Sequence, residues 1–301
     1  MITEHALPRP TPRTRRAVDA RGLLFALVLL IGGAALVWAR VHWAATLFGI
    51  LAAFEGLILT YREASPSAYA MTRKEIGSYF NSPVAYIVIT IFLLLMGSLF
   101  FFLRLFLYDE ASLRGLFDMA PWAFVFFGPA VSMRLLAEEK KTGTLELLIT
   151  MPVRDWEVVI GKYLGALFLL MVGVALTGFY ALTVAQMGEL DLGPVAGGYL
   201  GLFLLGATFV AIGLLTSSWT SNQIIAFILS LALCLALWML DDLRSYMPSG
   251  LASFVEYISV ASHHRNLARG IIDARDLLYY FSVIGICLYF SKEALSSRKW
   301  R

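Results

Sequence analysis

The sequence predicts an all-α, polytopic integral membrane protein. Hydrophobic residues make up 59% of the chain and charged residues only 15%, and the mean hydropathy is +0.75. Soluble domains typically contain about 25% charged residues. Apolar runs long enough to cross about 30 Å of hydrocarbon as helices recur along the 301 residues. Because these runs occupy most of the chain, we expect no sizeable soluble domain on it.

Eight apolar runs are expected to span the membrane as helices. Glu55 interrupts the second run, and Gly128-Pro129 predicts a kink in the fourth. The runs are Gly22–Ala39, Trp43–Thr60, Val84–Leu107, Pro121–Leu136, Val158–Met187, Val195–Thr216, Gln223–Leu240 and Leu277–Ser291.

Basic residues set the expected orientation, because short loops rich in Lys and Arg stay in the cytoplasm. The N-terminal tail, residues 61–82, residues 134–162 and the C-terminal tail hold 17 of the chain's 24 Lys and Arg residues. We therefore expect both termini to be cytoplasmic, in a bacterial cytoplasmic membrane. The tail 1–21 also resembles the basic start of a signal peptide, and Val37-Trp38-Ala39 is a passable cleavage site, so processing of the N-terminus stays open.

A short helix on the cytoplasmic surface is expected between the second and third spans. Thr72 and Glu75 have capping-box spacing, so the helix is expected to begin at Thr72. Asn81-Ser82-Pro83 is expected to end it before the chain enters the membrane. The expected apolar side is Ile76, Tyr79 and Phe80, and the expected solvated side is Arg73, Lys74 and Glu75. The alternative is an ordinary juxtamembrane linker.

The polar segment Glu138–Pro152 is expected to lie on the cytoplasmic side as a short amphipathic helix between two spans. Gly143 permits a sharp turn, and Pro152 ends the element. Asp155 is expected to cap the helix that follows. The expected apolar side is Leu145, Leu148 and Ile149, with Glu146 on the polar side. A solvated loop without a partner is the alternative.

Sequence motifs for chemistry on this chain are missing. Gly161-Lys162 lacks the earlier glycine and the Ser or Thr of a P-loop, so we expect no ATP site here. His263 and His264 are adjacent, and adjacent helical residues point about 100° apart, so we expect no metal site. Glu55 is the one acid within a predicted span and would be the residue that a coupling ion uses. The small residues Ala45, Gly49, Ala53 and Gly56 beside it favour a helix-packing role.

The segment between the seventh and eighth spans, residues 241–276, is too long for a simple turn. Ser253 and Glu256 have capping-box spacing, and apolar residues from Leu251 to Ile258 recur at helical spacing. We expect an interfacial or re-entrant helix that closes the outer end of a pathway. An inert helix on the outer leaflet is the alternative.

Residues of about 70–301 resemble the ABC-2-type permeases, in particular the branch associated with gliding-motility ABC systems. The most specific likeness is the segment from Arg134 through Glu138-Glu139-Lys140-Lys141-Thr142-Gly143-Thr144-Leu145-Glu146 to Leu148 and Pro152-Val153. A second likeness runs from Met71 through Thr72, Arg73, Lys74 and Glu75 to Tyr79, Phe80 and Tyr86. A third comprises His264, Arg269-Gly270-Ile271-Ile272-Asp273, Tyr279-Tyr280 and Arg298-Lys299-Trp300.

The resemblance implies a six-span permease domain over residues 63–301, preceded by the basic tail 1–21 and an extra two-span hairpin, 22–62. It implies a surface connecting helix at Thr72–Phe80 and an ATPase-coupling region at Glu138–Pro152. Partners would be an ATP-binding-cassette ATPase subunit, which carries ATP and Mg²⁺, a second permease subunit and membrane lipids. The resemblance also implies that this chain binds no cofactor and no nucleic acid and that it catalyses no bond-making reaction. Family members commonly have an aromatic residue after the histidine, where this chain has Arg265, so a specific role for His264 is open.

Two other functions remain possible from the sequence. A secondary transporter would depend on an ion gradient and on Glu55. A membrane anchor or scaffold for a surface or motility machine would function without ATP hydrolysis. The direction of transport is expected to be export by resemblance alone, and the sequence does not identify the substrate.

Overall fold

The computed structural model describes residues 55–105, 112–146, 152–187 and 191–297. The tail 1–21, the first predicted span, most of the second, the candidate cleavage site and Leu148 lie outside these ranges. The described residues are helical, turn or irregular, and no strand occurs among them. The predicted all-α class is therefore confirmed for this part of the chain.

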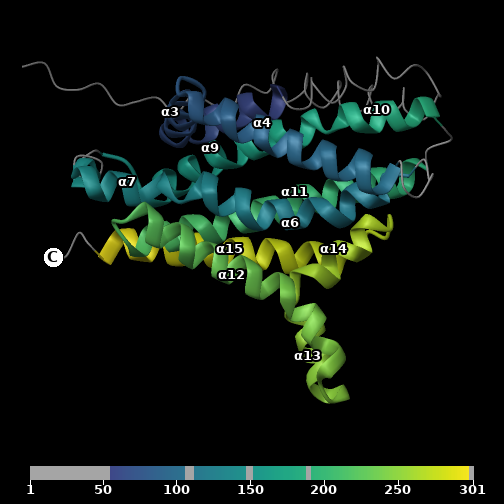
Figure 1. The fold of residues 1–301 in the computed structure, drawn as a ribbon. Coiled ribbons are helices and arrows are strands. Elements are labelled where there is room, and N and C mark those ends of the chain that lie inside the picture. Colours follow the sequence, from purple (N-terminus) through teal and green to yellow (C-terminus); the bar gives the residue numbers. More distant parts are fainter. Residues whose placement is uncertain (1–54, 106–111, 147–151, 188–190, 298–301) are drawn as a thin grey trace, which may run out of the picture. The chain divides into compact units, whose positions relative to one another are not determined.

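The chain forms two compact units, Met1–Tyr69 and Ala70–Arg301. In the first unit, residues 55–64 are helical, and Glu55 is exposed there. Helix α3 (Pro66–Phe80) begins in this unit and continues into the second (Figure 1). The other elements are α4 (Pro83–Ser98), the π-helical η1 (Leu99–Leu105), α6 (Arg114–Ser132), α7 (Arg134–Thr142), α9 (Asp155–Leu176), α10 (Gly178–Met187), α11 (Leu192–Trp219), α12 (Gln223–Leu243), the 3₁₀ turn η2 (Arg244–Tyr246), α13 (Ser249–Ile258), α14 (Val260–Ala268) and α15 (Ala274–Ser296).

Among the described residues, five helical segments are long and apolar enough to cross a membrane. They match the predicted third to seventh spans and are Pro83–Phe102, Arg114–Thr142, Asp155–Met187, Leu192–Trp219 and Gln223–Leu243. Helix α15 contains the predicted eighth span and is 23 residues long, but charged residues near both of its ends make it more polar. The total of eight spans stays a prediction.

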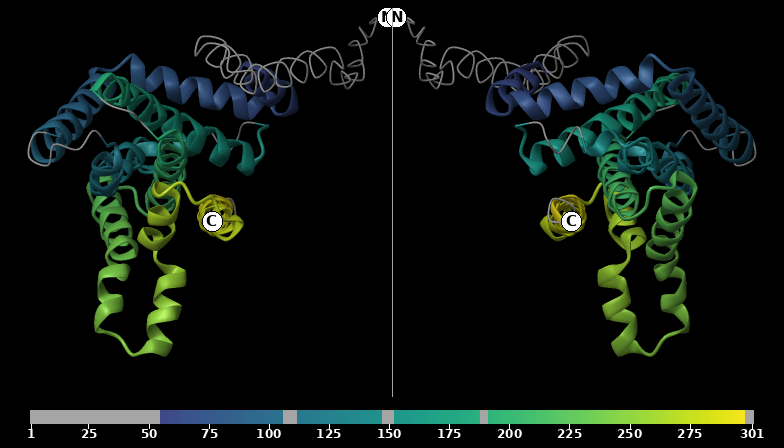
Figure 2. Two further views of the ribbon diagram at one scale, coloured as in Figure 1. Left: turned by 90° about the vertical axis from the view of Figure 1, so that its right-hand side faces the viewer. Right: turned by 90° about the vertical axis from the view of Figure 1, so that its left-hand side faces the viewer.

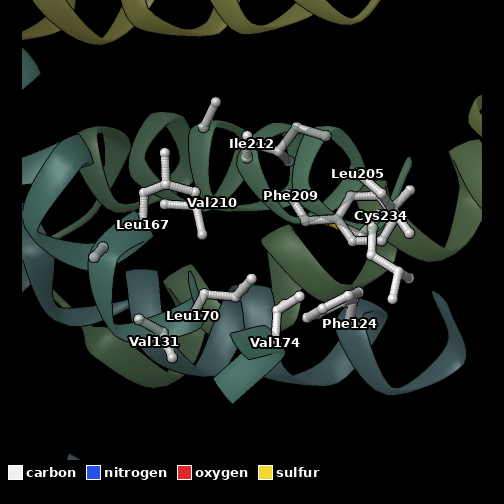
Figure 3. Close-up of a cluster of buried hydrophobic side chains, with 14 of the residues drawn as sticks. Phe124, Val131, Leu167, Leu170, Val174, Leu205, Phe209, Val210, Ile212 and Cys234 are labelled. Carbon is white, nitrogen blue, oxygen red and sulfur yellow. The ribbon is translucent and has the colours of Figure 1, made fainter. Parts of the chain in front are cut away.

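Helix α11 is the centre of the second unit. It packs against α6, α9, α12, α14 and α15, and Figure 3 shows its Leu205, Phe209, Val210 and Ile212 among buried side chains of neighbouring helices. Of the spanning segments, α11 is the most enclosed, whereas α4 and α12 leave most of their apolar surface exposed. Exposed apolar faces of this extent are typical of helices that contact lipid or a partner subunit.

Glycines bring α11 close to its neighbours. A Cβ atom on Gly213 would lie 1.7 Å from Ser132 Oγ of α6, and one on Gly198 would lie 2.3 Å from Phe117 Cε2. Helices inside a membrane gain little from the hydrophobic effect, so close backbone approach at small residues becomes a main source of attraction. These two positions therefore fix α11 against α6 at both ends of their contact.

The fourth predicted span has different bounds in the structure. Helix α6 begins at Arg114 rather than Pro121 and passes through Pro121 and Pro129. It ends at Ser132, whose hydroxyl donates to the Gly128 carbonyl at 2.6 Å. Met133, which keeps helical backbone angles, separates α6 from α7. This junction lies four residues after Pro129, close to the predicted kink.

The predicted capping box at Thr72 is wrong, whereas the predicted end of that helix is confirmed. Helix α3 begins at Pro66, so Thr72 lies inside it, and Glu75 is only 8% exposed. The helix ends at Phe80, and Ser82 caps α4 by accepting from the Val84 amide at 3.3 Å, with Pro83 in the first turn. The Glu75 carboxylate does not cap α3, because it forms an ion pair with a side chain of another helix.

Two further predicted caps are wrong. The N-cap of α9 is Arg154, not Asp155, and Glu157 accepts from the Arg154 amide at 3.0 Å. Helix α13 begins at Ser249, so Ser253 lies within it and donates to the Gly250 carbonyl. The expected helix between the last two spans is present as α13, and Figure 2 shows that the end of α12 and α13 form a hairpin that projects from the other helices of this unit.

Candidate functional site

The most enclosed charged group in the described chain is Lys162, in the second turn of α9. Its side chain is 1% exposed, and its Nζ donates to Glu75 Oε1 of α3 at 2.6 Å and to Glu139 Oε1 of α7 at 2.7 Å. Lys74 Nζ lies 3.8 Å from the same Glu139 oxygen. We call these four residues the Lys162 cluster. It joins three helices that are far apart in the sequence.

A glycine permits this arrangement. A Cβ atom on Gly165 would lie 2.4 Å from Glu75 Cβ, so only glycine allows α3 to lie directly against α9 at this point. Gly165 is three residues after Lys162 and therefore lies on the same side of α9. The close approach places the Glu75 carboxylate within reach of the ammonium group.

The cluster is balanced in charge, with two lysines and two glutamates. A buried ion pair is expensive to desolvate, and removal of one partner leaves an uncompensated charge that costs about 3–5 kcal/mol. Glu139 Oε2 is buried and accepts no hydrogen bond in the described part of the chain. The Lys162 ammonium is therefore the main compensation for both carboxylates.

Helix α7 is also fixed to the C-terminal end of α11. Ser217 Oγ accepts from the amides of Leu136 at 3.0 Å and Ala137 at 2.9 Å, and donates to the Met133 carbonyl at 2.8 Å. Lys140 Nζ donates to the Ser218 carbonyl. Amides in the first turn of a helix have no partner within the helix, so Ser217 acts as a cap from another element. Ser217 therefore ties the junction of α6 and α7 at Met133 to α11.

Tyr79 ties the end of α3 to the junction of α6 and α7. Its hydroxyl donates to the Val131 carbonyl at 2.7 Å, and the Arg134 guanidinium lies 3.9 Å from its ring centroid. Burial raises the pKa of Tyr79, so the phenol keeps its proton and remains a donor. The cation over the aromatic face adds a favourable contact.

The structure brings together part of the predicted coupling region. Glu138, Glu139, Lys140 and Thr142 belong to α7, and Gly143 ends it with a left-handed φ of 73°, which favours glycine. The predicted turn at Gly143 is confirmed. Residues 144–146 are helical again, with Leu145 buried at 4% exposure and Thr144 and Glu146 exposed. Pro152 is exposed and precedes α9.

Only some residues of the predicted surface connecting helix take part in the contacts described above. Lys74 and Glu75 enter the Lys162 cluster, and Tyr79 contacts Val131, as described above. Arg73 is exposed, and Phe80 packs edge-on to Phe168 of α9 at 6.2 Å between centroids. The expectation that Glu75 is solvated is wrong, because its carboxylate is paired with Lys162.

Within the third likeness, His264, Arg269, Gly270 and Asp273 are the residues predicted to act in the outer loop, and they make different contacts. His264 Nε2 bonds to the Phe117 carbonyl at 3.0 Å, and Asp273 caps α15 by accepting from the Arg275 amide at 3.0 Å. Gly270 has a φ of 82° and passes against Gly193, while Arg269 is exposed. Within the described ranges, no three His, Cys, Asp or Glu side chains group as metal ligands would.

Sequence reasoning missed Lys162 and the buried pair of His263 with Asp276, whose atoms Nδ1 and Oδ1 are 2.6 Å apart. A signal for Lys162 was present: a lysine one turn inside an apolar run must find a partner or reach the interface. The sequence contained no comparable signal for Glu75 as that partner, because 87 residues separate the two.

A comparison with known families supplies the identity. The family model described as ABC-2 family transporter protein matches residues 103–262, which is more than half of the chain. The match covers α6 to α13 and includes the whole segment Glu138–Pro152. No curated protein matches the chain. The chain belongs to the ABC-2 family of transporter proteins.

Proposed function

We propose that this chain is the membrane subunit of an ATP-binding-cassette exporter, and that a separate ATPase subunit drives it through the segment Glu138–Pro152. The family membership supports a transport subunit without catalytic chemistry of its own. ATP and Mg²⁺ would bind to the ATPase. The exposed apolar faces of α4 and α12 suit membrane lipids and a second permease subunit, in a homodimer or a heterodimer.

The Lys162 cluster is the observation that supports the proposal most strongly. A force applied to α7 meets a helix that is ion-paired to α9 and α3 and capped by α11. Leu145 is buried in the core, whereas Glu146 beside it is exposed. The segment therefore begins in a helix that is fixed to α3, α9 and α11, and it also presents a polar surface on which an ATPase would dock.

In this proposal the α7 end of the second unit faces the cytoplasm, and both termini lie there, in a bacterial cytoplasmic membrane. The distribution of Lys and Arg supports this orientation. The projecting hairpin of α12 and α13 then lies toward the outer side. The gliding-motility branch of the family remains part of the proposal.

Reversal of charge at Glu146 tests the proposal. The full chain is purified with its copurifying ATPase, in lipid nanodiscs, and the ATPase rate is compared with that of the free ATPase subunit. We expect Glu146→Arg to insert and fold normally. The change in ATPase rate on assembly with this variant should be at least about tenfold smaller than with the wild type, since one charged contact to a partner is worth about 1.5–3 kcal/mol.

Asp242→Arg is the matched control, because Asp242 is an exposed acid on α12 and lies away from the segment. It is expected to leave the ATPase rate unchanged. Equal rates for Glu146→Arg and the wild type would contradict the assigned docking surface. Purification of the intact chain with no ATPase partner would contradict the proposed function itself.

A further inference from the structure

Side chains from outside α13 cap its last three carbonyl groups. Ser262 Oγ of α14 donates to the Glu256 carbonyl at 2.7 Å. His263 Nε2 of α14 lies 3.1 Å from the Tyr257 carbonyl. Tyr279 of α15 donates its hydroxyl to the Ile258 carbonyl. The final carbonyls of a helix have no partner within it, so these bonds attach the projecting hairpin to the rest of the unit.

His263 differs from the other two side chains because both of its ring nitrogens face acceptors. Nδ1 is 2.6 Å from Asp276 Oδ1, and Nε2 faces the Tyr257 carbonyl. A neutral imidazole has one N–H only, whereas imidazolium has two. For Nδ1 to share a proton with Asp276 while Nε2 donates to the Tyr257 carbonyl, the pair must hold one proton more than a neutral histidine and a carboxylate. This is so whether the shared proton lies on Nδ1 or on Oδ1.

The surroundings hold the His263–Asp276 pair in this geometry. His263 stacks on the Tyr279 ring at 4.1 Å between centroids, and both His263 and Asp276 are buried. Asn266 Nδ2 donates to Asp276 Oδ2 at 3.2 Å, which holds the carboxylate in place. A positive charge next to the last carbonyls of α13 is also favoured by the helix dipole.

Other ionisable groups surround His263 on the elements that pack against it. They are Tyr257 of α13, Tyr279 and Tyr280 of α15, Arg265 of α14 paired with Asp241 of α12, and Arg244 of η2 paired with Glu256 of α13 at 3.0 Å, with Arg269, Asp273 and Arg275 farther along the same surface. Burial lowers the pKa of the adjacent His264, so that imidazole stays neutral.

We propose that His263 is a proton-dependent latch that fixes α13 to α14 and α15. With both nitrogens protonated, His263 bridges the Asp276 carboxylate and the Tyr257 carbonyl. Loss of one proton leaves Nδ1–H on Asp276, and the Nε2 lone pair then faces the carbonyl oxygen. The central cap of α13 is lost, and repulsion between two acceptors replaces it.

The latch borders an open polar cavity of about 710 Å³. His263 and Asp276 line it together with Tyr257 of α13 and Asp241 of α12. Because α13 forms one wall, its release widens the cavity. Acid conditions therefore hold the hairpin closed, and alkaline conditions loosen it.

Hydrogen exchange of the α13 amides in the full chain in nanodiscs tests the latch. After correction for the intrinsic exchange rate, we expect α13 to exchange at least about tenfold faster at about pH 8 than at about pH 5.5, since one charge-assisted bond is lost. The amides of α11 are expected to show no such change, because they report on the fold as a whole.

Two variants separate the latch from general stability. His263→Asn is expected to exchange rapidly in α13 at both pH values. Tyr279→Phe removes a neighbouring cap without a titrating group, so it is expected to raise exchange at both pH values and to keep the pH dependence. Wild-type exchange in α13 that does not vary with pH would overturn the proposal, as would an unchanged pH dependence in His263→Asn.

Discussion

Two buried charged clusters lie at opposite ends of α11 and differ in the chemistry of their cations. The Lys162 cluster adjoins the end that carries Ser217, and His263 lies in α14, which contacts α11 at Gly197. At 1.5 Å per residue these positions are about 30 Å apart along the helix. Lysine keeps its charge between about pH 5 and 8, whereas histidine does not. One end is thus joined permanently, and the other reversibly.

The largest expected effect comes from removal of the permanent cation. Lys162→Met leaves the buried Glu75 without a cation and Glu139 with only the more distant Lys74, and we expect it to lower the free energy of unfolding by about 3–5 kcal/mol. Thermal or denaturant unfolding of the purified chain in detergent measures the loss.

Lys141→Met is the control, since Lys141 is exposed at the end of α7 and should cost less than about 0.5 kcal/mol. Equal stability of the two variants would show that the cluster does not hold α3, α7 and α9 together.

A smaller effect is expected at the close contact between α11 and α6. Gly213→Ala places a Cβ atom 1.7 Å from Ser132 Oγ, and we expect it to destabilise the protein by about 1–3 kcal/mol through overpacking. Gly285→Ala in α15 is the matched control, because its Cβ atom meets nothing within 4 Å. Replacement of an interior helical glycine by alanine should there be neutral or stabilising, by up to about 1 kcal/mol.

If both alanine variants had the same unfolding free energy, close packing of α11 on α6 would not be a determinant of stability. If Gly213→Ala also altered the pH dependence of exchange in α13, the two ends of α11 would be mechanically connected.

The sequence was sufficient for the elements that depend on local patterns. Apolar runs located the third to seventh spans, Asn81-Ser82-Pro83 located the end of α3, and Gly143 located the end of α7. Each of these depends on hydropathy over one segment or on the backbone preferences of a few neighbouring residues.

Sequence reasoning failed where a side chain's partner is distant in the chain. Glu75 and Ser253 matched a local capping pattern, but Glu75 binds Lys162 of α9, and α13 begins before Ser253. The Lys162 cluster and the caps of α13 bring together residues of different helices. No spacing in one segment predicts such contacts. Hydropathy predicted α9 and α15 and local patterns predicted α3 and α13, whereas α14 was not predicted.

The central claim, that an ATPase docks at the segment Glu138–Pro152, is tested most directly by site-directed cross-linking. The cysteines Cys234 and Cys287 are both buried, so a cysteine introduced at Glu146 is the reactive one. We predict that Glu146→Cys forms a cross-link to the copurified ATPase and that Asp242→Cys, on the exposed surface of α12, does not. A cross-link from Asp242→Cys, with none from Glu146→Cys, would contradict the account.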